Sequence, residues 1–121
     1  MPFLKITFCI FILLSAIGTA AQDADEIQLL KKELAAASGD SAKAVAFAKL
    51  GYEYRNTNPD SGIYYTNSGL VLSEKIKDQA LIAKAKYQLG RLYHTKSNDS
   101  AAIILYNESL KLFELLKDTA N

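Results

Sequence analysis

The fold is decided by two stretches of similar sequence, FAKLGYEY at residues 47–54 and KYQLGRLY at residues 86–93. Both contain Leu-Gly followed by a tyrosine three residues later, and the Leu-Gly pair recurs after 39 residues. Asp60-Ser61 recurs at the same spacing as Asp99-Ser100. A match of a chain to itself at a period of about 20 to 50 residues indicates an array of stacked units. The sequence therefore predicts two copies of one structural unit.

Helical periodicity extends on both sides of these stretches. Apolar residues recur one turn apart, as Leu30 and Leu34 do, and clusters of Ser, Asp, Asn and Pro interrupt the pattern. No stretch shows sustained alternation of apolar and polar residues, so no strand is predicted. Short turns between helices of this length place consecutive helices antiparallel. The expected helices span residues 25–37, 42–54, 62–76, 79–95 and 101–116.

Aspartates stand at the predicted helix starts and turns. We expect Asp60 or Ser61 to cap the third helix and Asp78 to cap the fourth, because their side-chain oxygens accept hydrogen bonds from the first backbone N–H groups. Asp99 and Asp118 are interpreted in the same way. Capping explains these carboxylates without a catalytic role.

The repeated residues resemble the signature of tetratricopeptide repeats (TPRs). That signature places an aromatic residue, Leu-Gly and Tyr in the first helix of each pair, and a small residue before an aromatic one in the second. The matching residues are Phe47, Leu50, Gly51 and Tyr54 in one copy, and Leu89, Gly90, Tyr93, Ala102 and Tyr106 in the other. The chain departs from the pattern at Lys86 and Thr66, which replace aromatic residues. Its period is nearer 40 than ~34 and the closing Pro is missing, which implies longer second helices.

The resemblance implies an all-α fold of antiparallel helix-turn-helix repeats stacked as a short α-solenoid. The long-period form is similar to repeat arrays at the amino ends of secreted or membrane-tethered bacterial sensor proteins. The chain divides accordingly into a signal peptide (1–21), an amino-terminal packing helix with a linker (22–40), a first repeat (41–78), a second repeat (79–118) and the start of a further repeat (119–121).

Glycines occupy matching places in the two copies. Gly51 corresponds to Gly90, and Gly69 corresponds to Ser109. A glycine inside a helix costs ~1 kcal/mol relative to alanine, so recurrent small residues predict close helix contacts that offset this cost. For Gly69, a plain helix defect is the alternative.

The amino terminus has the order of a secretory signal peptide. Lys5 precedes an apolar run of 12 residues, ITFCIFILLSAI at 6–17, and small residues follow at 18–21. Cleavage is expected after Ala21, with Ala20 as the alternative. A retained membrane anchor is the competing interpretation, but a spanning helix needs ~20 apolar residues. We therefore expect an exported chain, periplasmic or extracellular, with no membrane span after signal cleavage.

Composition narrows the classes of function. Lys and Arg number 14 and Asp and Glu number 13, so loss of Lys5 leaves a formally neutral chain that does not suit nucleic-acid phosphates. The one cysteine, Cys9, lies in the signal segment, and His94 is the one histidine. The sequence has no Gly-rich phosphate loop and no Cys/His cluster. We therefore predict no enzyme, no cofactor and no metal site.

The resemblance also implies a groove. Tyr52 and Arg91 directly follow the two Leu-Gly pairs, and in the family this position and those one turn away line the concave face. The residues carried over are Val45, Ala48, Tyr52, Arg55 and Asn56 from the first pair, and Lys84, Tyr87, Arg91, His94 and Thr95 from the second. The basic and Asn residues of the family's clamp for C-terminal carboxylates are not reproduced at these positions. An ordinary solvated helix face is the alternative interpretation.

Two functions stay open from the sequence. Aromatic and cationic groups on one face favour a protein or peptide partner, perhaps held by the sensory end of a longer signalling protein. A structural or self-associating array with no ligand groove in use is the alternative. The last helix, over 101–117, supports it, because Ile103, Leu110 and Phe113 point to an additional contact and Leu112, Leu115 and Leu116 leave apolar area over. Lys117-Asp118 repeats Lys77-Asp78 and predicts a turn into a further helix.

Overall fold

The described part of the chain is all-α. The structure is a computed structural model that describes residues 21–120. Residues 21–36 are helical, and α2 (Asp40–Glu53), α3 (Pro59–Lys75), α4 (Gln79–Thr95) and α5 (Asp99–Thr119) follow. No strand occurs between residues 21 and 120, and none of the helices there is long and apolar enough to cross a membrane. The predicted signal peptide lies outside these residues except for Ala21, so it stays a prediction.

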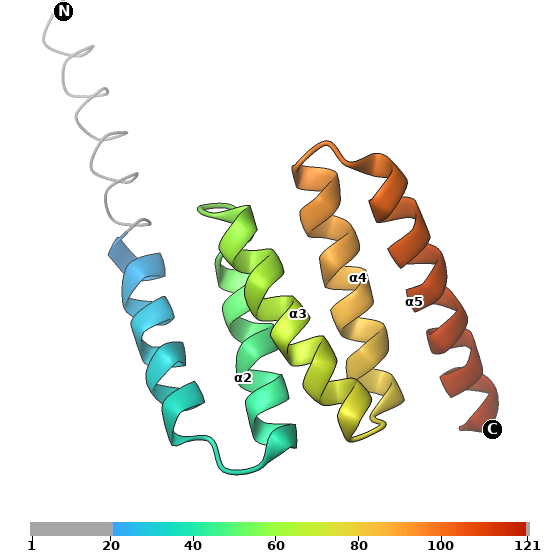
Figure 1. Cartoon of the computed structure of the whole chain (residues 1–121), viewed down its shortest axis with the longest axis horizontal. Helices are drawn as coiled ribbons and strands as arrows, with labels where there is room; N and C mark the ends of the chain where they lie inside the picture. The colour runs from blue at the N-terminus through green and yellow to red at the C-terminus, as the bar shows by residue number, and fades with distance from the viewer. Residues whose placement is uncertain (1–20, 121) are drawn as a thin grey trace, which may run out of the picture.

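Consecutive helices pack side by side in chain order (Figure 1). The contacts run from α2 to α3, from α3 to α4 and from α4 to α5, and α2 also touches α4. The helix over 21–36 and α5 form the two edges of this array (Figure 1). The predicted stacking of antiparallel helix pairs is therefore confirmed. We call α2 with α3 the first unit and α4 with α5 the second unit.

The amino-terminal helix is held on the first unit by apolar side chains. Ile27 and Leu30 are buried against Leu50 of α2, where Leu34 and two tyrosines complete the cluster. One of these, Tyr54, stacks on Tyr65 of α3 with 5.4 Å between ring centroids. The contact expected through Leu30 and Leu34 is confirmed, and Ile27 adds to it.

Asparagines cap α3 and α5, which corrects the expected boundaries. The side chain of Asn58 accepts a hydrogen bond from Ser61 N, and that of Asn98 accepts one from Ala101 N. The prediction of Asp60 or Ser61 as the cap was wrong, because Asn58 precedes Pro59, which begins the helix. Asp60 and Asp99 instead lie in the first helical turns. The caps also show that the two second helices correspond at a spacing of 40 residues rather than 39.

Asp78 behaves as predicted, whereas Asp118 does not. Asp78 accepts a hydrogen bond from Leu81 N at the start of α4, after Lys77 has turned the chain with φ 57°. The turn expected at Lys117-Asp118 is wrong, because α5 continues to Thr119. No glycine or proline interrupts α5, so the same dipeptide remains helical there.

The matched small residues do mark close helix contacts. A Cβ built on Gly51 would clash with Thr66 Oγ1 and lie 2.7 Å from Gln88 Nε2, and one on Gly90 would lie 2.7 Å from Tyr106 Cε1. Gly69 lies against the backbone of α2, 3.1 Å from Ala44 O on the same measure, so it is not a plain defect. Its counterpart Ser109 donates a hydrogen bond to Ala83 O, the oxygen that matches Ala44 O in the second unit.

Candidate partner-binding groove

The seven candidate groove residues come from α2, α4 and the turn after α2. They are Tyr52, Arg55, Asn56, Lys84, Tyr87, Arg91 and His94. The two helices carry them along the same side of the array because α2 and α4 are in contact. Their side chains nevertheless divide among three separate hollows, which we call the Tyr52 hollow, the arginine hollow and the Tyr87 hollow.

The Tyr52 hollow joins three helices. It has a volume of about 360 Å³ and lies between the amino-terminal helix, α2 and α4. Its lining residues are Glu26, Leu30, Glu33, Ala48, Lys49, Tyr52, Glu53, Lys84 and Gln88. Tyr52 and Lys84 therefore meet as expected from the groove. The carboxylates of the amino-terminal helix add an acidic wall that the sequence alone did not place there.

The arginine hollow collects cationic side chains at the carboxyl ends of α2 and α4. It has a volume of about 210 Å³ and is lined by Arg55, Asn56, Arg91, His94, Thr95 and Tyr106. Four of the candidate residues meet here. Tyr106 comes from α5 and was expected only to face the preceding helices, so the sequence analysis missed its part in this hollow.

Local contacts orient the groups of the arginine hollow. The Arg55 guanidinium lies 3.6 Å from the centroid of the Tyr52 ring, and its Nη1 donates a hydrogen bond of 2.7 Å to Tyr52 O. His94 Nδ1 lies 2.7 Å from an Asp99 oxygen. No carboxylate between residues 21 and 120 forms an ion pair with Arg55 or Arg91. The hollow therefore offers two guanidinium groups without an acidic partner.

Tyr87 lies apart from the other candidates. It lines the Tyr87 hollow, of about 540 Å³, together with Tyr106, Asn107, Ser109, Leu110 and Phe113. Its ring centroid is 5.6 Å from that of Tyr106. The expected continuous groove is thus wrong at this position, because the Tyr87 ring turns toward α5 and its apolar side chains rather than toward Arg91.

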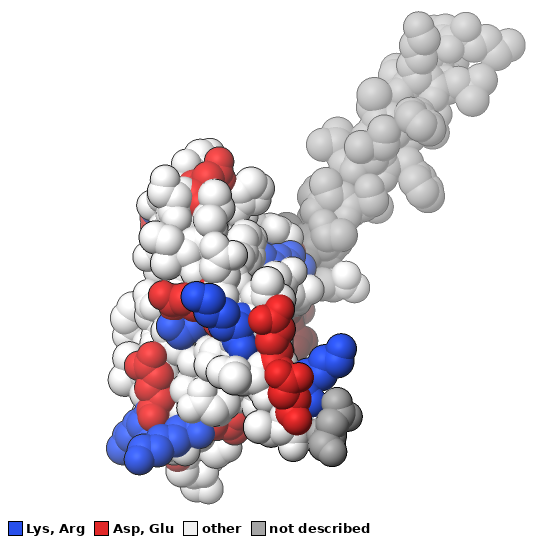
Figure 2. All heavy atoms as spheres, turned by 90° about the vertical axis from the view of Figure 1, so that its right-hand side faces the viewer, with Lys and Arg blue, Asp and Glu red and all other residues white. Residues whose placement is uncertain are grey.

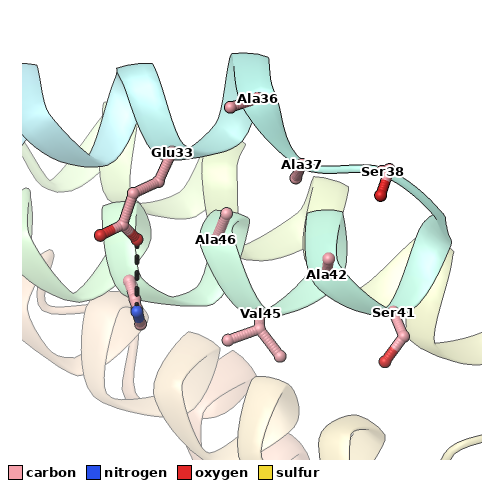
Figure 3. Close-up of a pocket in the computed structure, with 9 residues that line it drawn as sticks. Glu33, Ala36, Ala37, Ser38, Ser41, Ala42, Val45 and Ala46 are labelled. Carbon is pink, nitrogen blue, oxygen red and sulfur yellow. Dashed lines mark hydrogen bonds and ion pairs between the residues drawn. The ribbon is translucent and has the colours of Figure 1, made fainter.

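Val45 faces a different hollow again. This hollow, of about 660 Å³, lies between the amino-terminal helix and α2 and is lined mainly by Ala and Ser side chains (Figure 3). Glu33 and Lys49 form an ion pair of 3.3 Å at its edge (Figure 3). A single pair of this kind on the surface contributes little to stability. The run of alanines at residues 35–37 was the signal in the sequence for this open contact.

Two perturbed groups lie outside these hollows. The Lys75 ammonium hydrogen-bonds to the Asp40 carboxylate at 2.8 Å and lowers the pKa of Asp40. This pair links the start of α2 to the end of α3. A hydrogen bond to Tyr54 raises the pKa of Lys31. Both groups connect elements of the fold and contribute no chemistry to a groove.

The outer side of α5 is apolar, as the sequence indicated. Ile103, Leu110 and Leu115 are 58%, 55% and 61% exposed, and Leu112 and Leu116 are half-buried. Figure 2 views the molecule from this side and shows uncharged surface interrupted by clusters of both charges. Lys86 of α4 and Glu108 of α5 form one of the ion pairs at this edge.

Comparison with known proteins identifies the domain type. Residues 19–119 match the model of the family described as the SusR N-terminal TPR domain, and the chain belongs to this family. The resemblance to tetratricopeptide repeats is thereby confirmed, and this domain type of SusR-like regulators is non-catalytic. No curated protein and no solved structure matches the chain. No group of three or more potential metal ligands occurs within residues 21–120.

Proposed function

We propose that this SusR-type TPR domain is an exported protein-interaction module that binds a segment of a partner protein along α2 and α4. It would act as the amino-terminal sensory part of a bacterial signalling protein. Membership in a family of regulator domains supports the signalling role. The apolar run at residues 6–17 supports export.

The arginine hollow is the observation that carries this proposal. Arg55 and Arg91 come from different units, line one hollow and form no ion pair with a described carboxylate. Arg and Tyr side chains are enriched among the residues that contribute most to binding at protein interfaces. Stacking on Tyr52 orders Arg55 in advance, so less conformational entropy is lost when a partner binds.

Capture of partners from the exported fraction tests the proposal. Wild-type chain is expected to retain one or more proteins that Arg91→Ala and Tyr52→Ala lose. Lys111→Ala and Tyr64→Ala are matched controls, because both side chains are exposed on the other helices, α5 and α3. Equal retention by all five proteins would reject the groove.

A structural role is the second candidate, favoured by the exposed apolar side of α5. Self-association through 101–117 would bury Ile103, Leu110 and Leu115. Sedimentation at high micromolar concentration tests this candidate. A monomer that binds no hydrophobic dye would reject it, whereas a dimer that forms with Arg91→Ala unchanged would separate it from groove binding.

A further inference from the structure

The Tyr87 hollow occupies the place in the second unit that α4 fills in the first. Gln88 of α4 donates hydrogen bonds to Ala48 O at 3.1 Å and to Thr66 Oγ1 at 2.8 Å. Counting 39 residues on in the first helix and 40 in the second, the counterparts of Ala48 and Thr66 are Tyr87 and Tyr106. Both line the open hollow. The first unit thus shows how such a surface is covered.

Burial outlines the area that is left uncovered. Ile63 and Leu70 of α3 are half-buried, whereas their counterparts Ile103 and Leu110 of α5 are 58% and 55% exposed. The helix α4 packs on α3, and α5 contacts only α4 among the elements α2 to α5. The difference in exposure is therefore the contribution of a covering helix.

One pair of counterparts lies outside this area. Tyr64 of α3 is 66% exposed even though α4 covers its helix, and its counterpart Ile104 is 59% exposed. A helix placed on α5 as α4 is placed on α3 would leave Ile104 open. Ile104 thus provides an internal control on the same helix.

The hollow differs in chemistry from its counterpart. Gly51 lies against the Thr66 hydroxyl and the Gln88 amide, whereas Gly90 lies against the Tyr106 ring alone. The ring fills the space that the amide of Gln88 takes in the first unit. A glutamine brought to the same place would meet an aromatic ring instead of a hydroxyl acceptor, and a polar group buried without its partner is unfavourable. An apolar side chain suits the site better.

We propose that the Tyr87 hollow docks one amphipathic helix from outside residues 21–120, which packs on α5 as α4 packs on α3. The helix presents apolar side chains at the positions where α4 carries Gln88 and Leu92. Its stripe inserts between Tyr87, Leu110 and Phe113. The argument is continuity with the interface between α3 and α4, and it does not depend on the arginine hollow.

Binding of a peptide in trans tests this proposal. The probe is a lactam-stapled helical peptide with the sequence of Gln79–Thr95 in which the residue matching Gln88 is leucine, and the matched control peptide keeps the glutamine. We expect saturable binding to the full chain by fluorescence anisotropy. The leucine peptide should bind about tenfold more tightly, as expected for one apolar side chain that replaces a poorly paired amide.

Variants of the chain locate the binding surface. Leu110→Glu and Phe113→Glu should each weaken peptide binding about tenfold or more, since an apolar contact is replaced by a charge. Ile104→Glu should leave binding unchanged. Leu110 and Phe113 are exposed, so both variants should keep the wild-type circular dichroism spectrum and melting temperature.

Three results would overturn the proposal. The first is absence of peptide binding at high micromolar concentration. The second is an equal loss of binding with Ile104→Glu, which would indicate general stickiness of α5. The third is a dimer in sedimentation that Phe113→Glu dissociates, which would assign the hollow to a second copy of the chain.

Discussion

The first and second units share a period but differ in how each Leu-Gly contact is completed. In the first unit Thr66 is too small to fill the space beside Gly51, and Gln88 from α4 completes the contact with hydrogen bonds. In the second unit Tyr106 fills the space beside Gly90 without a neighbour. The first unit therefore depends on the helix that follows it, and the second keeps an aromatic surface open.

The units also differ in what covers them. The first lies between the amino-terminal helix, through Ile27 and Leu30, and α4. In the second, α5 buries only Ala102 and Ser109 fully. Stacked repeats gain stability from each neighbour, so the same kind of substitution should have different effects in the two units.

The largest difference is expected for leucine truncation. Leu50→Ala should reduce the free energy of unfolding by about 2 to 5 kcal/mol, because the side chain is fully buried between three helices. Leu115→Ala should change it by less than about 0.5 kcal/mol, because the side chain is 61% exposed. Urea unfolding of both variants measures the difference. Similar losses would show that α5 is covered in solution.

Substitution of the matched glycines gives a smaller effect. Gly90→Leu should cost about 1 to 3 kcal/mol by overpacking the Tyr106 ring. Gly51→Leu should lie at the upper end of that range or above, because a Cβ there also lies 3.0 Å from the Gly62 backbone oxygen, which cannot swing away. Thermal unfolding compares the two variants with Thr95→Leu, an exposed control. An unchanged midpoint for Gly90→Leu would mean that the contact is roomy.

Local signals predicted the fold well. Leu-Gly pairs, apolar spacing and turn clusters located the helices and their antiparallel order, because these depend on residues within one or two turns. The caps were less certain, since Asn58 lies two residues from Asp60 and both side chains accept hydrogen bonds. The dipeptide Lys117-Asp118 shows the same limit, because it is compatible with a turn and with a helix.

The candidate site was only partly predictable. Positions after Leu-Gly identified residues on the right side of α2 and α4, but not which hollow each side chain enters. Tyr87 joins α5 because Tyr106 offers an aromatic neighbour, a contact between different helices. Gln88 was overlooked for the same reason. Its signal in the sequence was Thr66, the position where the repeat pattern expects an aromatic residue and a partner has to compensate.

Exchange of the two solutions sharpens the comparison further. Thr66→Tyr should cost about 1 to 3 kcal/mol, because the ring meets the Gln88 amide beside Gly51. Adding Gln88→Ala removes the amide and should recover part of the loss, giving a coupling energy of about 0.5 to 3 kcal/mol for residues in direct contact. A double-mutant cycle in urea measures it. Strict additivity would mean that Gln88 and Thr66 act independently.

The smallest effect concerns an ion pair that only the first unit has. Asp40 and Lys75 pair at 2.8 Å, whereas their counterparts are Gln79 and Leu115. The hydrogen bond from Lys75 lowers the pKa of Asp40 below its ordinary value of 3.8. A lowered folded-state pKa stabilises the fold above the ordinary value, and this contribution disappears as the pH falls through the folded-state pKa. The loss should therefore lie below pH 3.8.

Urea midpoints at neutral pH and below pH 3.8 test this dependence. The difference between wild type and Asp40→Asn should be small at neutral pH, because both side chains face solvent and the pair is screened. It should disappear at the lower pH. The chain with Gln79→Asp and Leu115→Lys places the same pair in the second unit and should gain the same dependence, because both positions line one hollow at the end of α5. A gain at both pH values would instead assign the effect to the loss of an exposed leucine, and the two units would then differ in apolar cover alone.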